Sequence, residues 1–126
     1  MQLPKRIPTS VFEAVALLQI CASDADREAI LKMDHPGEMH HGFGMFLRNY
    51  WSLWKDESEL RDDFKDLYGL WGMADDVSGI ILHAWCLTEY GSSGKIIDSV
   101  LAKEVESFKK HWQRYGIDPA TGKKIS

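Results

Sequence analysis

The sequence contains only two cysteines, Cys21 and Cys86, and they form neither a CxxC motif nor another zinc-site spacing. Both lie in apolar stretches with helical spacing, which indicates buried free thiols in a reducing compartment. An excess of basic charge is also missing, since the formal net charge is −4. Proteins that bind nucleic acid through its phosphates are usually basic. The composition therefore argues against a zinc module and against a general nucleic-acid-binding protein.

No apolar run in the sequence is long enough to cross a bilayer. The apolar residues 11–22 follow two basic residues and superficially resemble the core of a signal peptide. Glu13 interrupts this run, however, and Ile20 stands where a cleavage site needs a small residue. Ser10 followed by Glu13 is instead the capping-box pattern of a helix N-terminus. We therefore expect a cytoplasmic protein.

Helical periodicity dominates the chain, and no segment shows a strand pattern, an internal repeat or a low-complexity block. With 126 residues the chain has the size of one ordinary domain. Capping residues and glycines separate the predicted helices. These cover about residues 10–22, 25–33, 38–54, 58–69, 76–90 and 94–115. The fourth could extend to Gly72, and the fifth is capped by Asp75 or Asp76. The sequence predicts one all-α domain (1–126) of five to six helices, divided into a core at about 10–90, a long amphipathic C-terminal helix at about 94–115 and a loose basic tail at 116–126.

The segment HHGFGMFLRNYWSLW, residues 40–54, is unusually aromatic. On a helix its aromatic side chains would cover more than half of the circumference, so protein should nearly surround it. Arg48 and Asn49 emerge from the middle of this segment, and a buried guanidinium needs a partner for its charge. Asp75 and Asp76 are the obvious partners, because they precede the apolar segment GIILHAWC, which we expect at the centre of the fold. These four polar residues are predicted to form a structural polar lock.

A metal or catalytic site is the functional alternative for the same region. It offers metal-ligand residue types, namely His40, His41, Asp75, Asp76 and His83. Their spacing is poor, because the adjacent His40 and His41 would point about 100° apart on a helix. The sequence has no HExxH motif, nucleophile elbow, P-loop or dinucleotide fingerprint. Cys86 and His83 have helical spacing, but a cysteine on an apolar helix is usually core. We predict no catalytic residue, metal or cofactor, and keep an enzyme or metal-dependent site built on the His/Arg/Asp cluster as the alternative.

The segments HHGFGMFLRNYWSLW and ADDVSGIIL together resemble a family of small bacterial and phage-borne domains whose function is not established. The family pattern is H-x-G-x-G, then R-N, an aromatic residue and L-W, followed later by D-D-x-S-x-x-I-I. This chain matches the pattern at His40 or His41, Gly42, Gly44, Arg48, Asn49, Trp51, Leu53, Trp54, Asp75, Asp76, Ser78, Ile80 and Ile81. The resemblance covers about residues 10–90. It implies a shared fold and brings no activity with it.

The predicted fourth helix carries a row of carboxylates along one face. The row consists of Glu59, Asp62, Asp63 and Asp66, with Asp56 and Glu57 just before the helix, and we call these six residues the acidic face. Leu60, Phe64 and Leu67 form the opposite stripe, which should point to the core. One interpretation of the acidic face is an ordinary solvated surface that Arg61 and Lys65 partly compensate. The other is a docking surface, because a helical row of carboxylates presents charge where the phosphates of nucleic acid would lie.

The functional prediction is a non-catalytic protein-binding domain that docks through the acidic face on a basic protein partner, such as a nuclease or a defence effector. Size and charge suggest an inhibitor of the immunity type or the phage anti-defence (anti-CRISPR-like) type, which is an argument by analogy. Neither nucleic-acid binding nor a membrane is expected. A third hypothesis is a homo-oligomeric structural module, in which a homodimer assembles through the C-terminal helix. The apolar stripe of that helix consists of Ile97, Leu101, Val105, Phe108 and Trp112.

Overall fold

Six α-helices and one short π-helix make up the regular structure in the part of the chain that the computed structural model describes, residues 1–31, 40–89 and 94–125. They are α1 (Val11–Cys21), α2 (Asp24–Leu31), the π-helix η2 (His40–Gly44), α3 (Met45–Tyr50), α4 (Glu59–Tyr68), α5 (Ala74–Glu89) and α6 (Gly94–Arg114). No strand occurs within those ranges. The prediction of one all-α domain with a long C-terminal helix is confirmed.

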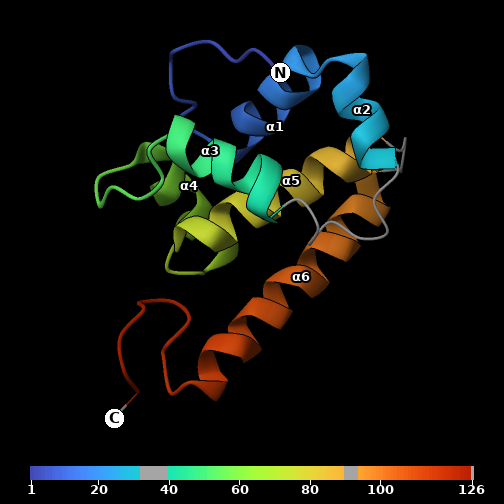
Figure 1. Cartoon of the computed structure of the whole chain (residues 1–126). Coiled ribbons are helices and arrows are strands. Elements are labelled where there is room, and N and C mark those ends of the chain that lie inside the picture. The colour runs from blue at the N-terminus through green and yellow to red at the C-terminus, as the bar shows by residue number, and fades with distance from the viewer. Residues whose placement is uncertain (32–39, 90–93, 126) are drawn as a thin grey trace.

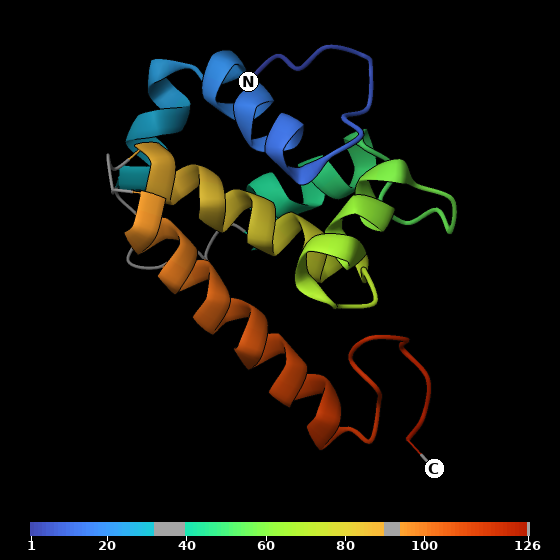
Figure 2. The same cartoon turned by 180° about the vertical axis from the view of Figure 1, so that it is seen from behind.

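Helix α5 is the centre of the fold. Ten of its 16 residues are buried, and among them Ile80, Ile81 and Trp85 are fully enclosed. Helix α1 lies above α5 and α6 below it in both views (Figures 1 and 2), while η2, α3 and α4 complete the packing around α5. The apolar segment GIILHAWC therefore has the central position that its lack of a polar face requires.

Local capping signals set the ends of α1 and α4. The Ser10 hydroxyl accepts a hydrogen bond of 3.0 Å from the backbone N–H of Glu13 at the start of α1. The Ser58 hydroxyl does the same for the N–H of Arg61, at 3.2 Å, at the start of α4. Gly69 ends α4 with a left-handed backbone (φ 66°), which glycine adopts without steric cost. These boundaries agree with the sequence-based expectation.

The predicted continuous helix over 38–54 is wrong in its extent. The described part consists of η2 and the short α3, which ends at Tyr50. The reason is that Trp51 and Leu53 are both fully buried, whereas on a continuous helix they would point about 200° apart. The chain therefore leaves the helix, and the N–H of Leu53 bonds back to the carbonyl of Arg48 at 2.9 Å. Ser52 takes a left-handed backbone (φ 52°) to make this turn, which is uncommon for a residue with a side chain.

The start of α5 also differs slightly from the prediction. The helix begins at Ala74, so that Asp75 and Asp76 lie in its first turn and neither is the residue before it. Carboxylates in the first turn are still favoured, because they face the positive end of the helix dipole. Gly91, which was expected to end this helix, lies outside the described residues.

Helix α6 packs along α5 with its inner face, and its C-terminal end extends away from the other helices (Figure 2). Val105 is buried, and Leu101, Phe108 and Trp112 pack against the core. The side chain of Ile97, the remaining member of the expected stripe, lies outside the described residues. The apolar stripe of α6 therefore serves the core of its own chain.

The C-terminal tail is ordered, and the expectation of a loose tail at 116–126 is wrong for its described part. The backbone N–H of Trp71, in the connection between α4 and α5, donates to the carbonyl of Pro119 at 2.8 Å. Within the tail, Ile125 N–H donates to the carbonyl of Gly116 at 2.8 Å. Gly122 lies directly on the Trp71 ring, where a Cβ would come within 2.4 Å of a ring carbon. The tail is thus packed on an aromatic residue that is distant in sequence.

Candidate functional site

Arg48 is a buried charge, with a side chain that is only 1% exposed. Its Nε lies 3.4 Å from Oδ1 of Asp75, and one of its terminal nitrogens donates to the Ser78 hydroxyl at 2.9 Å. The Ser78 hydroxyl in turn donates to the carbonyl of Asp75 at 3.1 Å. The expected ion pair between the aromatic segment and the start of α5 is therefore present. Ser78, which holds the same guanidinium from the next turn of α5, was not foreseen as a partner.

Asn49 and Trp54 cover the outer side of this ion pair. Asn49 is exposed, and its side-chain oxygen accepts a hydrogen bond of 3.0 Å from the indole N–H of Trp54. The Arg48 guanidinium carbon lies over the Trp54 ring, 5.8 Å from the ring centroid, which is a distance typical of a cation–π contact. Asn49 thus orients the ring that closes the polar lock.

Asp76 makes a contact other than the expected one. Its carboxylate accepts a hydrogen bond of 2.8 Å from the indole N–H of Trp112 and so connects α5 to α6. Burial raises the pKa of Asp76, and the negative charge of Asp75 acts in the same direction, while the Trp112 hydrogen bond and His111 oppose the shift. Asp75 and Asp76 therefore fix two different helices to α5.

The residues of the predicted metal or catalytic alternative point to different parts of the molecule. His41 is exposed, whereas His83 is half-buried and lies 3.9 Å from Glu104 of α6. The side chain of His40 lies outside the described residues. Burial raises the pKa of the Cys86 thiol to about 11, so that this cysteine is protonated at neutral pH and is a poor nucleophile. Across residues 1–31, 40–89 and 94–125, no three His, Cys, Asp or Glu side chains are placed to hold a metal ion.

Five members of the acidic face are exposed to solvent. They are Asp56 and Glu57 just before α4, and Glu59, Asp62 and Asp66 along it. The ion pair described for this group is the 3.9 Å contact between Asp62 and Lys65, whose side chains are 69% and 41% exposed. A contact of that length at the surface contributes little to stability. Residues 56–66 hold six carboxylates against two cations, Arg61 and Lys65, and so keep a net charge of −4.

The sixth member, Asp63, has a structural contact. Its carboxylate accepts a hydrogen bond of 2.8 Å from the backbone N–H of Val11 and so caps the N-terminus of α1.

Leu67 departs from the expected core-facing stripe, because it is 57% exposed. The neighbouring Tyr68 takes the inner position and packs edge-on against the Phe64 ring, 5.1 Å between centroids.

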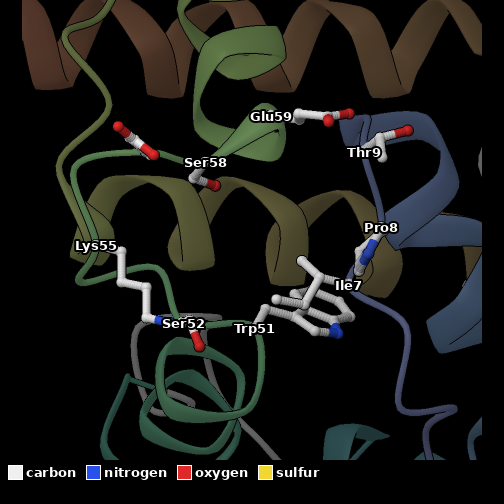
Figure 3. Close-up of a pocket in the computed structure, with 9 residues that line it drawn as sticks. Ile7, Pro8, Thr9, Trp51, Ser52, Lys55, Ser58 and Glu59 are labelled. Carbon is white, nitrogen blue, oxygen red and sulfur yellow. The ribbon is translucent and has the colours of Figure 1, made fainter.

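A cavity of about 300 Å³ lies next to the acidic face (Figure 3). Its walls come from the N-terminal segment around Pro8, the connection after α3 and the first residues of α4. Lys55, Glu57 and Glu59 bring charges of both signs to it, and the side chain of Trp51 also lines it. The mixed charge gives this cavity no clear preference for an anion or a cation.

The fold and this surface define a small all-α domain that is built around a buried arginine and has an acidic outer face. The model of the family called Domain of unknown function (DUF6794) matches residues 7–87, and the chain belongs to this family. The match begins before α1 and ends in the last turn of α5, so that it includes the polar lock and the acidic face but not α6. No curated protein and no solved structure matches the chain. In the described part of the chain, no helix is both long and apolar enough to cross a membrane.

Proposed function

We propose that this member of the DUF6794 family is a non-catalytic protein-binding domain that docks through its acidic face on a basic protein partner. The observation that supports this proposal is the exposure of five carboxylates between Asp56 and Asp66, a segment in which six carboxylates outnumber the two cations Arg61 and Lys65. Like charges at this spacing on a helix repel one another. A cationic partner would relieve the repulsion and would be attracted over a distance before contact.

The partner that suits such a surface is a protein that itself binds nucleic acid, since its groove is built to receive rows of negative charge. A nuclease or a defence effector is of this kind. We therefore propose an inhibitor of the immunity type or the phage anti-defence (anti-CRISPR-like) type, from a bacterial or phage source and active in the cytoplasm. This step is an analogy from size and charge.

An enzyme or metal-dependent site has less support from the geometry. Arg48 and Asp75 are engaged with each other, His83 faces α6, and His41 is on the surface. The described members of that cluster thus do not meet at one place where a substrate could bind.

The first test of the proposal uses the tagged chain as bait in a lysate of the cells from which it comes. Asp62→Lys and Asp66→Lys each change the net charge from −4 to −2, because a charge of −1 becomes +1. We expect the wild-type chain to retain a basic protein at low salt and to release it at high salt. Either substitution should weaken this retention about tenfold, since opposed charges then become like charges. Asp63 is left unchanged, because replacing it would remove the cap of α1.

Glu106→Lys is the matched control, because Glu106 is exposed on α6 and its replacement changes the net charge by the same amount. Retention by this variant should equal that by the wild-type chain, and helical circular dichroism should be the same for all three variants. If Glu106→Lys weakens retention as much as Asp62→Lys does, the partner responds to overall charge and the acidic face is not its docking surface.

A further inference from the structure

The outer face of α1 carries an apolar stripe of which the two large side chains are exposed and the middle residue, Ala16, is half-buried. Phe12 is 85% exposed and Ile20 is 79% exposed. Ala16 lies between them, and the spacing i, i+4, i+8 places all three on one side of the helix. The distance from Phe12 to Ile20 is about 12 Å, or rather more than two turns.

Helix α1 is apolar on nearly all of its circumference, with Glu13 and Gln19 as its two polar residues. Helices of this kind are normally covered on every side. Here Val11, Ala14 and Leu18 form the buried side. The stripe on the other side is therefore an apolar helix face whose two large side chains are left exposed in the described part of the chain.

Carboxylates flank the stripe at both ends. At the Phe12 end, the hydrogen bond from Val11 to Asp63 holds the acidic face beside the start of α1. At the Ile20 end, α2 follows after two residues and presents Asp24 and Glu28, both exposed.

The nearby arginines already have acidic partners. Arg6 pairs with Glu13, and Arg27 pairs with Glu89 at 3.0 Å and also lies 4.0 Å from Asp24, so that Glu28 is the carboxylate at this end without a described arginine partner. The surface as a whole is thus apolar along its middle and negative at its ends.

We propose that this surface, the stripe Phe12–Ala16–Ile20 with its flanking carboxylates, binds an amphipathic helix of the partner protein that has an apolar face bordered by lysine or arginine. Such a helix would cover Phe12 and Ile20 with its apolar side chains and place its cations against the carboxylates at both ends. The inference rests on the proposed function and adds to it the kind of partner segment that is recognised.

A second copy of the chain is a poorer match to this surface. Among the described helices, α6 is the long amphipathic one with many lysines, and its apolar stripe is used on its own core through Val105, Phe108 and Trp112. The α6 of a second copy would therefore have no apolar face left to offer to Phe12 and Ile20.

The test uses a fluorescein-labelled synthetic peptide of leucine and lysine, about 14 residues or four helical turns long, with the leucines on one side. A scrambled peptide of the same composition and a leucine–glutamate peptide serve as comparisons. Fluorescence anisotropy of each peptide is measured with the whole chain. We expect the amphipathic basic peptide to bind at least about tenfold more tightly than either comparison peptide.

Two sets of variants separate the contribution of the stripe from that of charge. Phe12→Ser combined with Ile20→Ser should weaken binding of the amphipathic peptide about tenfold and leave helical circular dichroism unchanged. Tyr115→Ser combined with Ile125→Ser removes two exposed apolar side chains elsewhere, 70% and 56% exposed, and should change binding by less than about twofold. The same stripe variant should also lose the protein that the wild-type bait retains.

The outcomes distinguish this inference from the function on which it rests. If Asp62→Lys weakens binding while the stripe variant does not, docking by charge stands and the helix-binding surface is overturned. If neither change weakens binding, both proposals fail. Equal binding of the scrambled peptide overturns the inference, and so does a wild-type dimer in light scattering that the stripe variant dissociates, because a second copy would then occupy the stripe.

Discussion

At the scale of single residues, Arg48 shows how a charge in an aromatic core can be accommodated. Its ion pair with Asp75 is asymmetric, because the arginine side chain is 1% exposed and the aspartate side chain is 35% exposed. Loss of the aspartate would leave a buried cation without this counter-charge, whereas loss of the arginine would leave a carboxylate that water can reach.

This asymmetry predicts different costs for the two substitutions. Asp75→Asn should lower the free energy of unfolding by about 3 kcal/mol, which is typical of breaking a buried pair. Arg48→Met keeps the volume of the side chain and should cost less, about 1–2 kcal/mol. Urea unfolding of both variants measures the difference, and a larger loss for Arg48→Met would contradict the prediction.

Asp76 makes the folded state less stable as the pH rises, whereas a carboxylate with a lowered pKa makes it more stable. Burial raises its pKa above the ordinary value of 3.8, so the folded state holds this proton more tightly than the unfolded state does. Its contribution to stability is therefore largest below about pH 3.8 and is lost as the pH rises through the raised pKa.

Asp76→Asn should remove this pH dependence, because the amide oxygen can still accept the hydrogen bond from Trp112. Relative to the wild-type chain, the variant should gain stability between about pH 3.8 and neutral pH. Denaturant unfolding of both chains across that range measures the gain. A constant difference between them would show that Asp76 titrates alike in the folded and unfolded states.

At the scale of elements, the connection between α4 and α5 and the C-terminal tail hold each other through Trp71. Gly122→Ala would place a methyl group within 2.4 Å of the Trp71 ring, in a backbone conformation (φ 72°) that already disfavours a side chain. We expect the tail to leave Trp71, and the Trp71 amide, which now donates to Pro119, to exchange its hydrogen about tenfold faster.

Gly116→Ala is the control for this prediction. Gly116 has a similar backbone (φ 70°), but a Cβ there would meet no atom within 4 Å. Its replacement carries the backbone cost alone, about 1 kcal/mol, and should leave the Trp71 amide protected. Equal exchange rates in the two variants would mean that contact with the ring does not hold the tail.

The sequence allowed the helices to be predicted wherever their boundaries depend on neighbouring residues. Ser10, Ser58 and Gly69 act over one turn and are visible in a short window. The end of α3 is different, because it depends on the simultaneous burial of Trp51 and Leu53 by residues far away in the sequence. No local stop signal accompanies it, and so the helix was predicted too long.

The same distinction applies to the candidate site. A charged residue inside an aromatic segment must have a partner, and this requirement was enough to suggest Asp75. The contacts of Asp76 with Trp112 and of Asp63 with Val11 join helices that are distant in sequence, and no local pattern predicts them. The exposed side of α1 could not be predicted either, because an apolar helix alone indicates burial on every side.

At the scale of the whole molecule, the family match and the fold do not end at the same place. The DUF6794 match ends at residue 87, yet Val105, Phe108 and Trp112 of α6 cover part of α5. Helix α6 is thus part of the core of this chain although it lies outside the matched region. The acidic face and the apolar stripe both belong to the matched region, where the proposed partner would bind.

The position of Trp54 has a practical consequence for experiments. Among the five tryptophans, Trp51 and Trp85 are fully buried, whereas Trp54 is 55% exposed and lies two residues before the acidic face begins. Its indole is stacked on a cation and held by Asn49. A protein that binds on this side would therefore shield Trp54 from a soluble quencher. Tryptophan fluorescence quenching would report this binding, while the emission of the buried Trp51 and Trp85 would stay unchanged.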